Sequence, residues 1–293
     1  MRVLIVGSGF VGQAVAAAVE RDGGHAVLAS RRPVPGTARW VRLDATDPAG
    51  CAQAVQRVRP DAVVAVHGPS DVTWCEQQPA AALAAHRDAT RNLVRALGRT
   101  RLVLISTDNV FDGRSPDNDE ETATAPANAY GAAKLAAEAE LAGHPDATVL
   151  RVSLVYGPET ARPGKRTNFA AACVRGWQAD EVVPAPVDQW TTPVHVADVA
   201  AVTLAAVRGA PPLLHLGGPE RISRFDWAHR LAARLGYPAA LIGPVTRDSG
   251  PYACRPANSC LTSRLLPASL DAWRLRVRGV DEGADGLVAA VAG

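Results

Sequence analysis

The sequence predicts an α/β fold, in which a doubly wound parallel sheet of the Rossmann type carries a smaller C-terminal portion. Three observations predict it. A short apolar stretch at the N-terminus runs into a glycine-rich turn and a helix, strand and helix patterns alternate through the first half, and proline and glycine become denser after Gly157. We therefore expect two units, residues 1–156 and 157–293, with some elements of the second returning to the first.

The alternating pattern predicts six strands and four helices. Short apolar stretches indicate buried strands, and alanine-rich stretches with helical periodicity indicate helices. The expected strands are residues 2–6, 26–29, 40–43, 62–67, 101–106 and 148–152, and the expected helices are residues 12–21, 49–57, 79–97 and 125–141. Strands that alternate with helices pair in parallel, because each helix carries the chain back across the sheet.

The turn after the first strand reads Gly7-Ser8-Gly9-Phe10-Val11-Gly12. Gly7 permits a tight turn, Gly9 lets the backbone approach a pyrophosphate, and Gly12 allows the helix to pack closely on the strand. The following helix offers free N–H groups and the positive end of its dipole to an anion. Placed directly after a strand, this pattern predicts a dinucleotide-binding domain over residues 1–156.

The end of the second strand indicates which dinucleotide is bound. Chains that bind NAD usually place a carboxylate there for the ribose hydroxyls, but this strand ends in Ser30, Arg31 and Arg32. Guanidinium groups bind phosphate oxygens bidentately, so the sequence favours NADPH over NADH. The alternative is that both arginines are solvated loop charges.

Only two of the 31 lysines and arginines are lysines, and one of them, Lys134, follows Tyr130 by four residues. In a helix that spacing places the phenol and the ammonium on one face, about one turn apart. A cation about 4 Å away favours the phenolate by up to roughly 4 kcal/mol at an effective dielectric near 20. We therefore expect Lys134 to lower the pKa of Tyr130 and to make it a general acid. A bare Y-x-x-x-K pattern more often marks an ordinary helix tyrosine and a surface lysine.

A polar stretch, Ser106-Thr107-Asp108-Asn109, follows the fifth strand. Ligands of parallel sheets bind beyond the carboxyl ends of the strands. A hydroxyl there can hold a carbonyl oxygen while Tyr130 protonates it. By itself such a stretch is more often a turn at a strand end.

Composition argues against several other classes of protein. A net charge of +2 without a basic run gives little support for nucleic-acid binding, and no apolar run approaches the ~18 residues of a membrane span. A strand begins at once, so we expect no signal peptide and a cytoplasmic location. The five cysteines are scattered without C-x-x-C pairs, so neither a metal site nor disulfides are expected.

Together these elements resemble the extended short-chain dehydrogenase/reductase superfamily, and within it the branch of dTDP-4-dehydrorhamnose reductases and their relatives, which reduce 4-keto nucleotide sugars. Further segments match that branch, so the likeness spans about residues 1–261. They are VFDG at 110–113, YGAAKLAAE at 130–138, NF at 168–169, DQ at 188–189, PVHVADVA at 193–200 and RPANS at 255–259.

The resemblance implies roles for individual residues. Thr107, Tyr130 and Lys134 would form the catalytic set, and Lys134 would also hold the nicotinamide ribose. The residues implied for the rest of the cofactor are Gly7, Gly9, Phe10, Val11 and Gly12 at the pyrophosphate, Asp44 and Ala45 at the adenine, Gly68 and Pro69 at the ribose, and Val152 and Ser153 at the nicotinamide.

The resemblance also makes residues 157–293 the substrate-binding portion. Its candidate substrate contacts, with two from the polar stretch, are Asp108, Asn109, Asn168, Gln189 and Arg255. Arg255 is the natural partner of a nucleotide diphosphate. Without the family match, an isolated arginine is more often a solvated or structural charge.

Departures from the family pattern bear on the substrate. Asn109 stands where the family usually has tyrosine, and Leu154 replaces an aromatic residue common in rhamnose-forming enzymes. A flat aromatic offers a hexose a stacking face, so we expect a different ketosugar or another ketone, with Trp190 able to restore one wall. His86, in the helix expected over residues 79–97, stands in place of an asparagine of the family, which leaves a proton relay open.

Other features have simpler interpretations. Asp198 is expected to N-cap a helix over residues 198–208 with His195 beside it, rather than to do chemistry. The acidic run at 117–121 is expected to be a solvated loop rather than a metal site. His67 and His86 either line the cofactor cleft or are satisfied interior groups.

The predicted reaction is hydride transfer from NADPH to a ketone, the 4-keto group of a nucleotide-linked deoxysugar or a related biosynthetic intermediate. Tyr130 would donate the proton, and Thr107 would hydrogen-bond the developing alkoxide. One alternative is an epimerase or dehydratase that retains NAD(P). Another is a regulatory subunit that binds dinucleotide without turnover. The helices at 79–97 and 125–141 can pair across a homodimer or pack within one chain.

Overall fold

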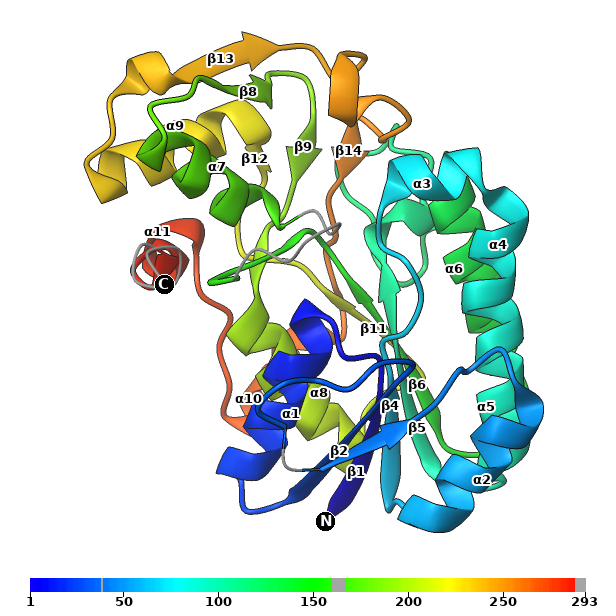
Figure 1. Ribbon diagram of the computed structural model, residues 1–293. Coiled ribbons are helices and arrows are strands. Elements are labelled where there is room, and N and C mark those ends of the chain that lie inside the picture. The colour runs from blue at the N-terminus through cyan, green and yellow to red at the C-terminus, as the bar shows by residue number, and fades with distance from the viewer. Residues whose placement is uncertain (38, 160–166, 288–293) are drawn as a thin grey trace.

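The computed structural model describes residues 1–37, 39–159 and 167–287. A seven-stranded sheet forms the lower part of the molecule (Figure 1), with the strand order β11-β6-β5-β4-β1-β2-β3 and parallel pairing throughout. The predicted doubly wound parallel sheet is confirmed. Its strands are β1 (Arg2–Val6), β2 (His25–Ser30), β3 (Trp40–Arg42), β4 (Ala62–Ala65), β5 (Arg101–Thr107), β6 (Ala147–Val152) and β11 (Leu213–Leu216).

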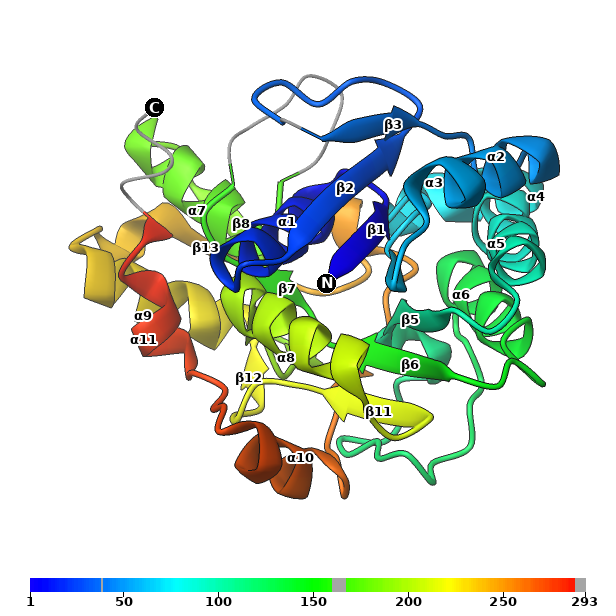
Figure 2. The ribbon, with the colours of Figure 1, turned by 90° about the horizontal axis from the view of Figure 1, so that it is seen from below.

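Helices cover both faces of this sheet (Figure 2), which is why its central strands are continuous apolar runs. Every residue of β4 and β5 is buried. One face packs on α1 (Phe10–Arg21) and α8 (Val196–Arg208), and the other on α2 (Pro48–Val58), α5 (Ala89–Leu97) and α6 (Ala129–Ala139). All six predicted strands are present, with ends shifted by no more than two residues.

Two elements of the second half complete this layer. β11 pairs with β6, and α8 packs beside α1. The sequence predicted a return of this kind but did not predict β11, whose four residues, Leu213–Leu216, are too short a run to distinguish from a loop. The boundary at residue 157 stays a prediction.

The helix predicted over residues 79–97 is interrupted. It consists of α4 (Pro79–Leu83), a π-helical turn (Ala84–Asp88) and α5, and the unpredicted α3 (Val72–Gln77) precedes it. The π turn carries His86, whose Nε2 lies 3.0 Å from the carbonyl oxygen of Pro69. Such a turn inserts one residue without ending the helix, so an alanine-rich composition does not reveal it.

Helix α6 begins at Ala129 rather than at residue 125. Asn128 has an extended backbone and caps the helix, because its Oδ1 accepts a hydrogen bond of 2.8 Å from the Gly131 N–H. This helix packs against α4 and the π turn within the chain. The homodimer stays a prediction.

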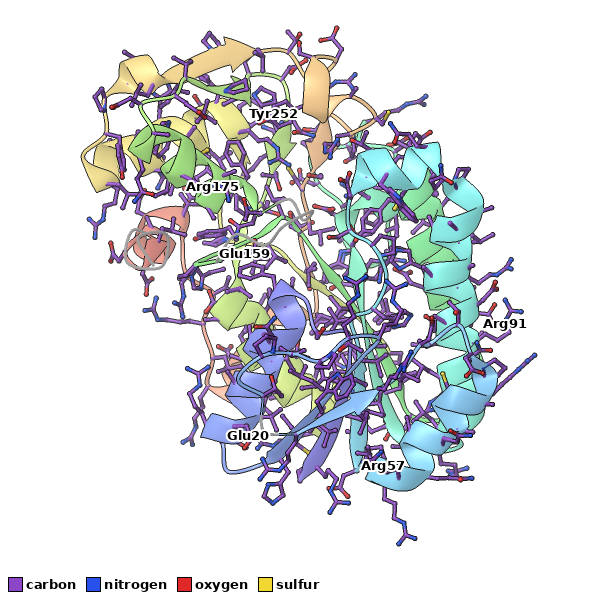
Figure 3. All side chains as sticks on the ribbon, in the orientation of Figure 1. Glu20, Arg57, Arg91, Glu159, Arg175 and Tyr252 are labelled. Carbon is purple, nitrogen blue, oxygen red and sulfur yellow. The ribbon has the colours of Figure 1, made fainter. Side chains whose placement is uncertain are left out.

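The remaining elements form a smaller unit above the carboxyl ends of the strands (Figure 1). Its core surrounds Tyr156, Trp177 and Trp227, and Tyr252 is labelled in this upper part in Figure 3. Its strands are β7 (Val155–Tyr156), β8 (Val183–Pro186), β9 (Trp190–Thr191), β10 (Val194–His195), β12 (Ile222–Ser223), β13 (Ile242–Val245) and β14 (Asn258–Ser259). Its helices are α7 (Phe169–Gln178), α9 (Arg224–Leu235) and α11 (Val280–Ala284), and α10 (Leu266–Trp273) lies lower, near β11.

The prediction that Asp198 caps a helix over residues 198–208 is wrong. Helix α8 begins at Val196, and its N-cap is His195, whose Nδ1 accepts from the Ala197 N–H at 3.2 Å. Asp198 lies inside the first turn, where it pairs with Arg278 at 2.9 Å. Histidine is an uncommon N-cap and aspartate is a common one. The preferences of residue types alone therefore favour Asp198 as the cap.

The acidic run at 117–121 is more than a solvated loop. Glu120 accepts from the backbone N–H of His215 at 3.0 Å and from the Ser263 hydroxyl, and Asp119 pairs with Arg264 at 2.8 Å. The run therefore ties β11 to the segment that follows β14. Within the described residues, no cluster of His, Cys, Asp or Glu could hold a metal ion, and no helix is both long and apolar enough to cross a bilayer.

Candidate active site

The glycine turn is shaped to receive a pyrophosphate. A Cβ on Gly12 would lie 2.0 Å from the carbonyl oxygen of Gly7, and Gly7 has a φ of +120°, so both positions require glycine. A Cβ on Gly9 would meet no atom within 4 Å, so the turn is open on that side. Gly9 is also the N-cap of α1 and supplies no side-chain cap to its free N–H groups. Phe10 and Val11 begin this helix, and the turn fits a dinucleotide.

At the end of β2, Ser30 donates its hydroxyl to the carbonyl oxygen of Arg32 at 2.7 Å. Arg31 and Arg32 are exposed, and neither guanidinium has a hydrogen-bond or ion-pair partner among the described residues. Hydrogen bonds from Thr46 lower the pKa of Asp44, and the charge of Arg31 adds to this effect. The residues predicted at the adenosine end therefore lie at one edge, with two cations available to an anion.

The three predicted catalytic residues meet at the carboxyl end of β5. Thr107 is the last residue of that strand, and Tyr130 and Lys134 lie on α6. Thr107 lies close enough to Tyr130 for its side chain to oppose the rise in the pKa of the phenol. The Nζ of Lys134 donates to the carbonyl oxygen of Ile105, within β5. Strand β5 and helix α6 lie side by side, and together they bring a phenol, a hydroxyl and an ammonium into one place.

The prediction that Lys134 lowers the pKa of Tyr130 is wrong in this structure. Burial raises the pKa of the phenol well above its ordinary value; the hydrogen bond with Thr107 opposes this shift, and the charge of Asp108 adds to it. The ammonium is engaged by the Ile105 carbonyl. Desolvation therefore outweighs any attraction of the phenolate to the cation. Tyr130 is a firmly neutral phenol, which is still a proton donor.

Burial lowers the pKa of Lys134 to about 8, and the charge of Glu138 acts in the opposite direction. An unfolded lysine titrates near ~10.4, so between these values the unfolded chain binds the extra proton. The free energy of unfolding should therefore rise as the pH increases from about 8 to ~10.4 through this group. Urea titrations across that range should show this rise relative to Lys134→Met, which lacks the group. Identical pH profiles for the two proteins would contradict the shift.

His86 is an interior group beside Tyr130. It is buried, the two rings meet edge to face with centroids 5.7 Å apart, and burial lowers the pKa of His86 to about 2. Its ring would collide with a Cβ on Gly68, which has a φ of +90°. Pro69 supplies the carbonyl partner of its Nε2. A neutral imidazole therefore shapes the wall that Gly68 and Pro69 form.

Asp108 is a buried acceptor rather than an open one. Its carboxylate accepts from Ser153 at 3.0 Å, from the Asn109 amide at 2.8 Å and from Thr107 at 3.1 Å. Burial raises its pKa to about 6, against those hydrogen bonds. Ser153, which follows Val152 at the end of β6, also donates to the carbonyl oxygen of Ser259 at 2.9 Å. This network holds Thr107 in place.

The other predicted substrate residues belong to the smaller unit. Asn168 caps α7 and donates to the carbonyl oxygen of Gly157 at 2.9 Å. Gln189 is buried, and its Oε1 has no hydrogen-bond partner in the described part of the chain. Arg255 donates to Thr73 at 3.3 Å and borders a cleft of about 550 Å³, whose lining includes none of the three predicted catalytic residues. Their roles toward a substrate stay predictions.

Arg224, the first residue of α9, is buried and was not singled out from the sequence. Its neighbours at three, four and seven residues, Trp227, Ala228 and Leu231, are all buried. An arginine that shares the apolar face of an amphipathic helix is out of place in a simple packing pattern. Its place on the apolar face of α9 was the signal in the sequence that could have singled out this arginine.

Comparison with known proteins decides the family. The model for the RmlD substrate binding domain matches residues 1–281 of this chain. The chain belongs to the RmlD substrate binding domain family. The branch of the short-chain dehydrogenase/reductase superfamily expected from the motifs is thereby confirmed, although a dinucleotide turn and a catalytic pair alone occur more widely.

Relatives of this RmlD-family chain carry more than one name. Methionine adenosyltransferase 2 subunit beta of Pongo abelii is 30% identical over 295 residues, which cover 96% of this chain and 83% of that protein. dTDP-4-dehydrorhamnose reductase of Salmonella typhimurium is 29% identical over 255 residues, which cover 80% of this chain and 83% of that protein. The crystal structure of dTDP-4-dehydrorhamnose reductase from Bacillus anthracis in complex with NADP superposes with a TM-score of 0.83 at 24% identity, over 97% of each chain.

Proposed function

We propose that this protein is an NADPH-dependent reductase of a ketone, the 4-keto group of a nucleotide-linked deoxysugar or a related biosynthetic intermediate. The observation that carries the proposal is the meeting of Thr107, Tyr130 and Lys134 at the carboxyl end of β5, in a sheet whose first strand runs into an open glycine turn. A phenol, a hydroxyl and a buried ammonium at that edge suit the reduction of a carbonyl.

Each residue has a distinct task in this proposal. Bound NADPH would supply the hydride. Tyr130 holds the proton for the carbonyl oxygen, because burial keeps its phenol neutral. Thr107 offers a hydroxyl to the same oxygen as negative charge develops. Lys134 holds positive charge within the site, fixed by the Ile105 carbonyl.

The cofactor proposal draws on the basic end of β2. The relative from Bacillus anthracis was solved with NADP, and Arg31 and Arg32 are exposed where a 2′-phosphate would lie. Replacing both by glutamine is expected to weaken NADPH binding by roughly 10- to 100-fold, because charge-assisted hydrogen bonds are lost. NADH binding should change little. Fluorescence titration with each cofactor measures both.

Arg57→Gln is the control for that experiment, since Arg57 lies on α2, away from the carboxyl ends of the strands (Figure 3). It should bind both cofactors like the unaltered protein. Equal weakening of NADPH and NADH in the double variant would mean that the arginines support the turn rather than select the phosphate.

The reductase and its two alternatives differ in what they do to NADPH and to the sugar. The resemblance to methionine adenosyltransferase 2 subunit beta favours the regulatory subunit as the second candidate, whereas the complete set of Thr107, Tyr130 and Lys134 favours an enzyme. Incubation with NADPH and a panel of nucleotide 4-ketosugars tests this. Net NADPH oxidation with a reduced sugar supports the reductase. Interconversion of sugars without net oxidation would indicate an epimerase, and binding without conversion would indicate a regulatory subunit.

The proposal assigns the dinucleotide to residues 1–156 and the nucleotide sugar to residues 157–293, with the reaction at the junction. It includes a cytoplasmic location and the pairing of two chains through the helices at 79–97 and 125–141. Neither nucleic acid nor a membrane is a proposed partner.

A further inference from the structure

The side-chain amide of Asn109 lies at the carboxyl end of β5 and is hydrogen-bonded within the chain. Asn109 is the second residue of a 3₁₀ turn (Asp108–Val110) that Thr107 caps. Its Nδ2 donates to the Asp108 carboxylate at 2.8 Å and to the Thr107 hydroxyl at 3.3 Å. Its Oδ1 accepts from Nδ2 of Asn128 at 2.9 Å. An amide nitrogen has two N–H donors, so both donors of Asn109 are used by the protein itself.

The orientation of the two amides follows from backbone groups at the end of this network. The Gly131 N–H, in the first turn of α6, can only donate, and Oδ1 of Asn128 accepts from it at 2.8 Å. Nδ2 of Asn128 then faces two acceptors, the Cys254 carbonyl oxygen at 3.1 Å and Oδ1 of Asn109. Since Oδ1 of Asn109 faces Asn128, its Nδ2 must face the end of β5. The start of α6 therefore determines where the Asn109 donors point.

This arrangement leaves the Thr107 hydroxyl with one role. A threonine hydroxyl has two acceptor lone pairs and one proton. Asn109 supplies a donor to each lone pair, from its backbone N–H at 3.2 Å and from its Nδ2 at 3.3 Å. The hydroxyl can therefore act only as a donor, and it donates to Asp108 at 3.1 Å. Its effect on Tyr130 agrees with this role, because the Thr107 side chain opposes the rise in the pKa of the phenol, as a donor does.

Asn109 also allows the Thr107 proton to change partner. The Asp108 oxygen that accepts from Thr107 at 3.1 Å also accepts from Asn109 at 2.8 Å. The other oxygen accepts from Ser153 at 3.0 Å. If the Thr107 hydroxyl turns to a ligand, the buried carboxylate keeps a donor on each oxygen. Thr107 can then donate to a ligand without the cost of leaving a buried charge unsatisfied.

We propose that Asn109 is a positioning residue, which holds the Thr107 hydroxyl as a hydrogen-bond donor to the carbonyl oxygen of the substrate. It acts through Thr107, in place of the substrate contact that the family resemblance implied. The inference rests on the proposed function, because it takes that oxygen to gain negative charge. The tyrosine that the family usually has at this position carries its only side-chain donor at the end of a ring. This chain has an amide donor beside Thr107 instead of an aromatic face.

Steady-state kinetics with the reducible ketosugar test this role. Asn109→Ala should lower kcat roughly 10-fold, about the effect of one hydrogen bond lost in the transition state. The KM for the ketosugar and the affinity for NADPH should stay near normal. Asn109→Asp keeps the shape and can still accept from Asn128, but it has no N–H donors, so its kcat should fall at least as far. A raised KM at unchanged kcat would mean that Asn109 contacts the substrate, and would overturn the inference.

A double variant tests whether Asn109 acts through Thr107. Thr107→Val removes the hydroxyl and keeps the shape, so adding Asn109→Ala to it should cause no further loss of kcat. Losses that multiply would show that Asn109 acts independently of Thr107 and would overturn the inference. Asn118→Ala is the matched control, because it removes another buried amide, bonded to the Cys260 carbonyl oxygen at 2.9 Å. It should lower the melting temperature and leave kcat normal.

The pKa of Asp108 gives a readout that needs no substrate. Burial raises this pKa to about 6, and the hydrogen bonds from Ser153, Thr107 and Asn109 act in the opposite direction. In Asn109→Ala the pKa should rise further, whereas in Asn118→Ala it should not change. ¹³C NMR of the aspartate side chains, assigned with Asp108→Asn, measures it. An unchanged pKa in Asn109→Ala would overturn the inference. A raised pKa in a protein that reduces no ketosugar would support the positioning of Thr107 while contradicting the proposed reductase.

Discussion

Replacing Tyr130 by phenylalanine is expected to lower turnover at least ~10²-fold, the usual contribution of a positioned general acid. In the proposed reaction the phenol is the proton donor, and burial keeps it protonated. The variant removes one oxygen atom and keeps the ring that packs edge to face on His86 at 5.7 Å. The substitution should therefore lower the rate constant for turnover without altering the fold. Steady-state NADPH oxidation with the reducible ketosugar measures it.

Cofactor binding and a second tyrosine serve as controls for this prediction. Tyr130→Phe should bind NADPH with near-normal affinity. Tyr237→Phe loses the same hydroxyl from a ring that packs on Trp177 in the upper unit, with centroids 5.4 Å apart, and should keep normal turnover. If Tyr130→Phe retains normal turnover, the tyrosine is not the acid.

The fold was predictable because its signals are local. Each strand of the first half is a short apolar run, and the glycine turn directly follows one of them. Elements that depend on tertiary contacts were not predictable. β11 becomes a strand only because β6 offers an edge, and His195 rather than Asp198 caps α8 because Arg278 holds the aspartate.

The proximity of the predicted catalytic residues was predictable, but their electrostatics were not. Strand order brings Thr107 beside Tyr130, as expected for a parallel sheet. The spacing of Tyr130 and Lys134 fixes their helix face but says nothing of burial or of the Ile105 carbonyl that engages the ammonium. The predicted sign of the tyrosine pKa shift was wrong for that reason.

Replacing Glu138 by glutamine is expected to lower the free energy of unfolding by ~3–5 kcal/mol, the usual cost of breaking a buried ion pair. Glu138 and Arg151 are 8% and 7% exposed and are 2.7 Å apart. Arg151 donates to both carboxylate oxygens, and Ser106 donates to one of them. Glutamine keeps the volume but leaves the guanidinium buried beside a neutral amide. Urea denaturation of the apoprotein measures the loss.

Two further variants show whether the unpaired buried charge causes the loss of stability. The double variant Glu138→Leu with Arg151→Met removes both charges and should recover much of the lost stability, because neither ion then stays buried alone. Asp285→Asn breaks the exposed pair with Arg234, where both side chains are more than half exposed, and should cost only ~0–1 kcal/mol.

Glu138 also raises the pKa of Lys134, so Glu138→Gln should move the pH-dependent rise in stability to start below about pH 8. An unshifted onset would show that the ion pair supports the fold without changing the pKa of Lys134.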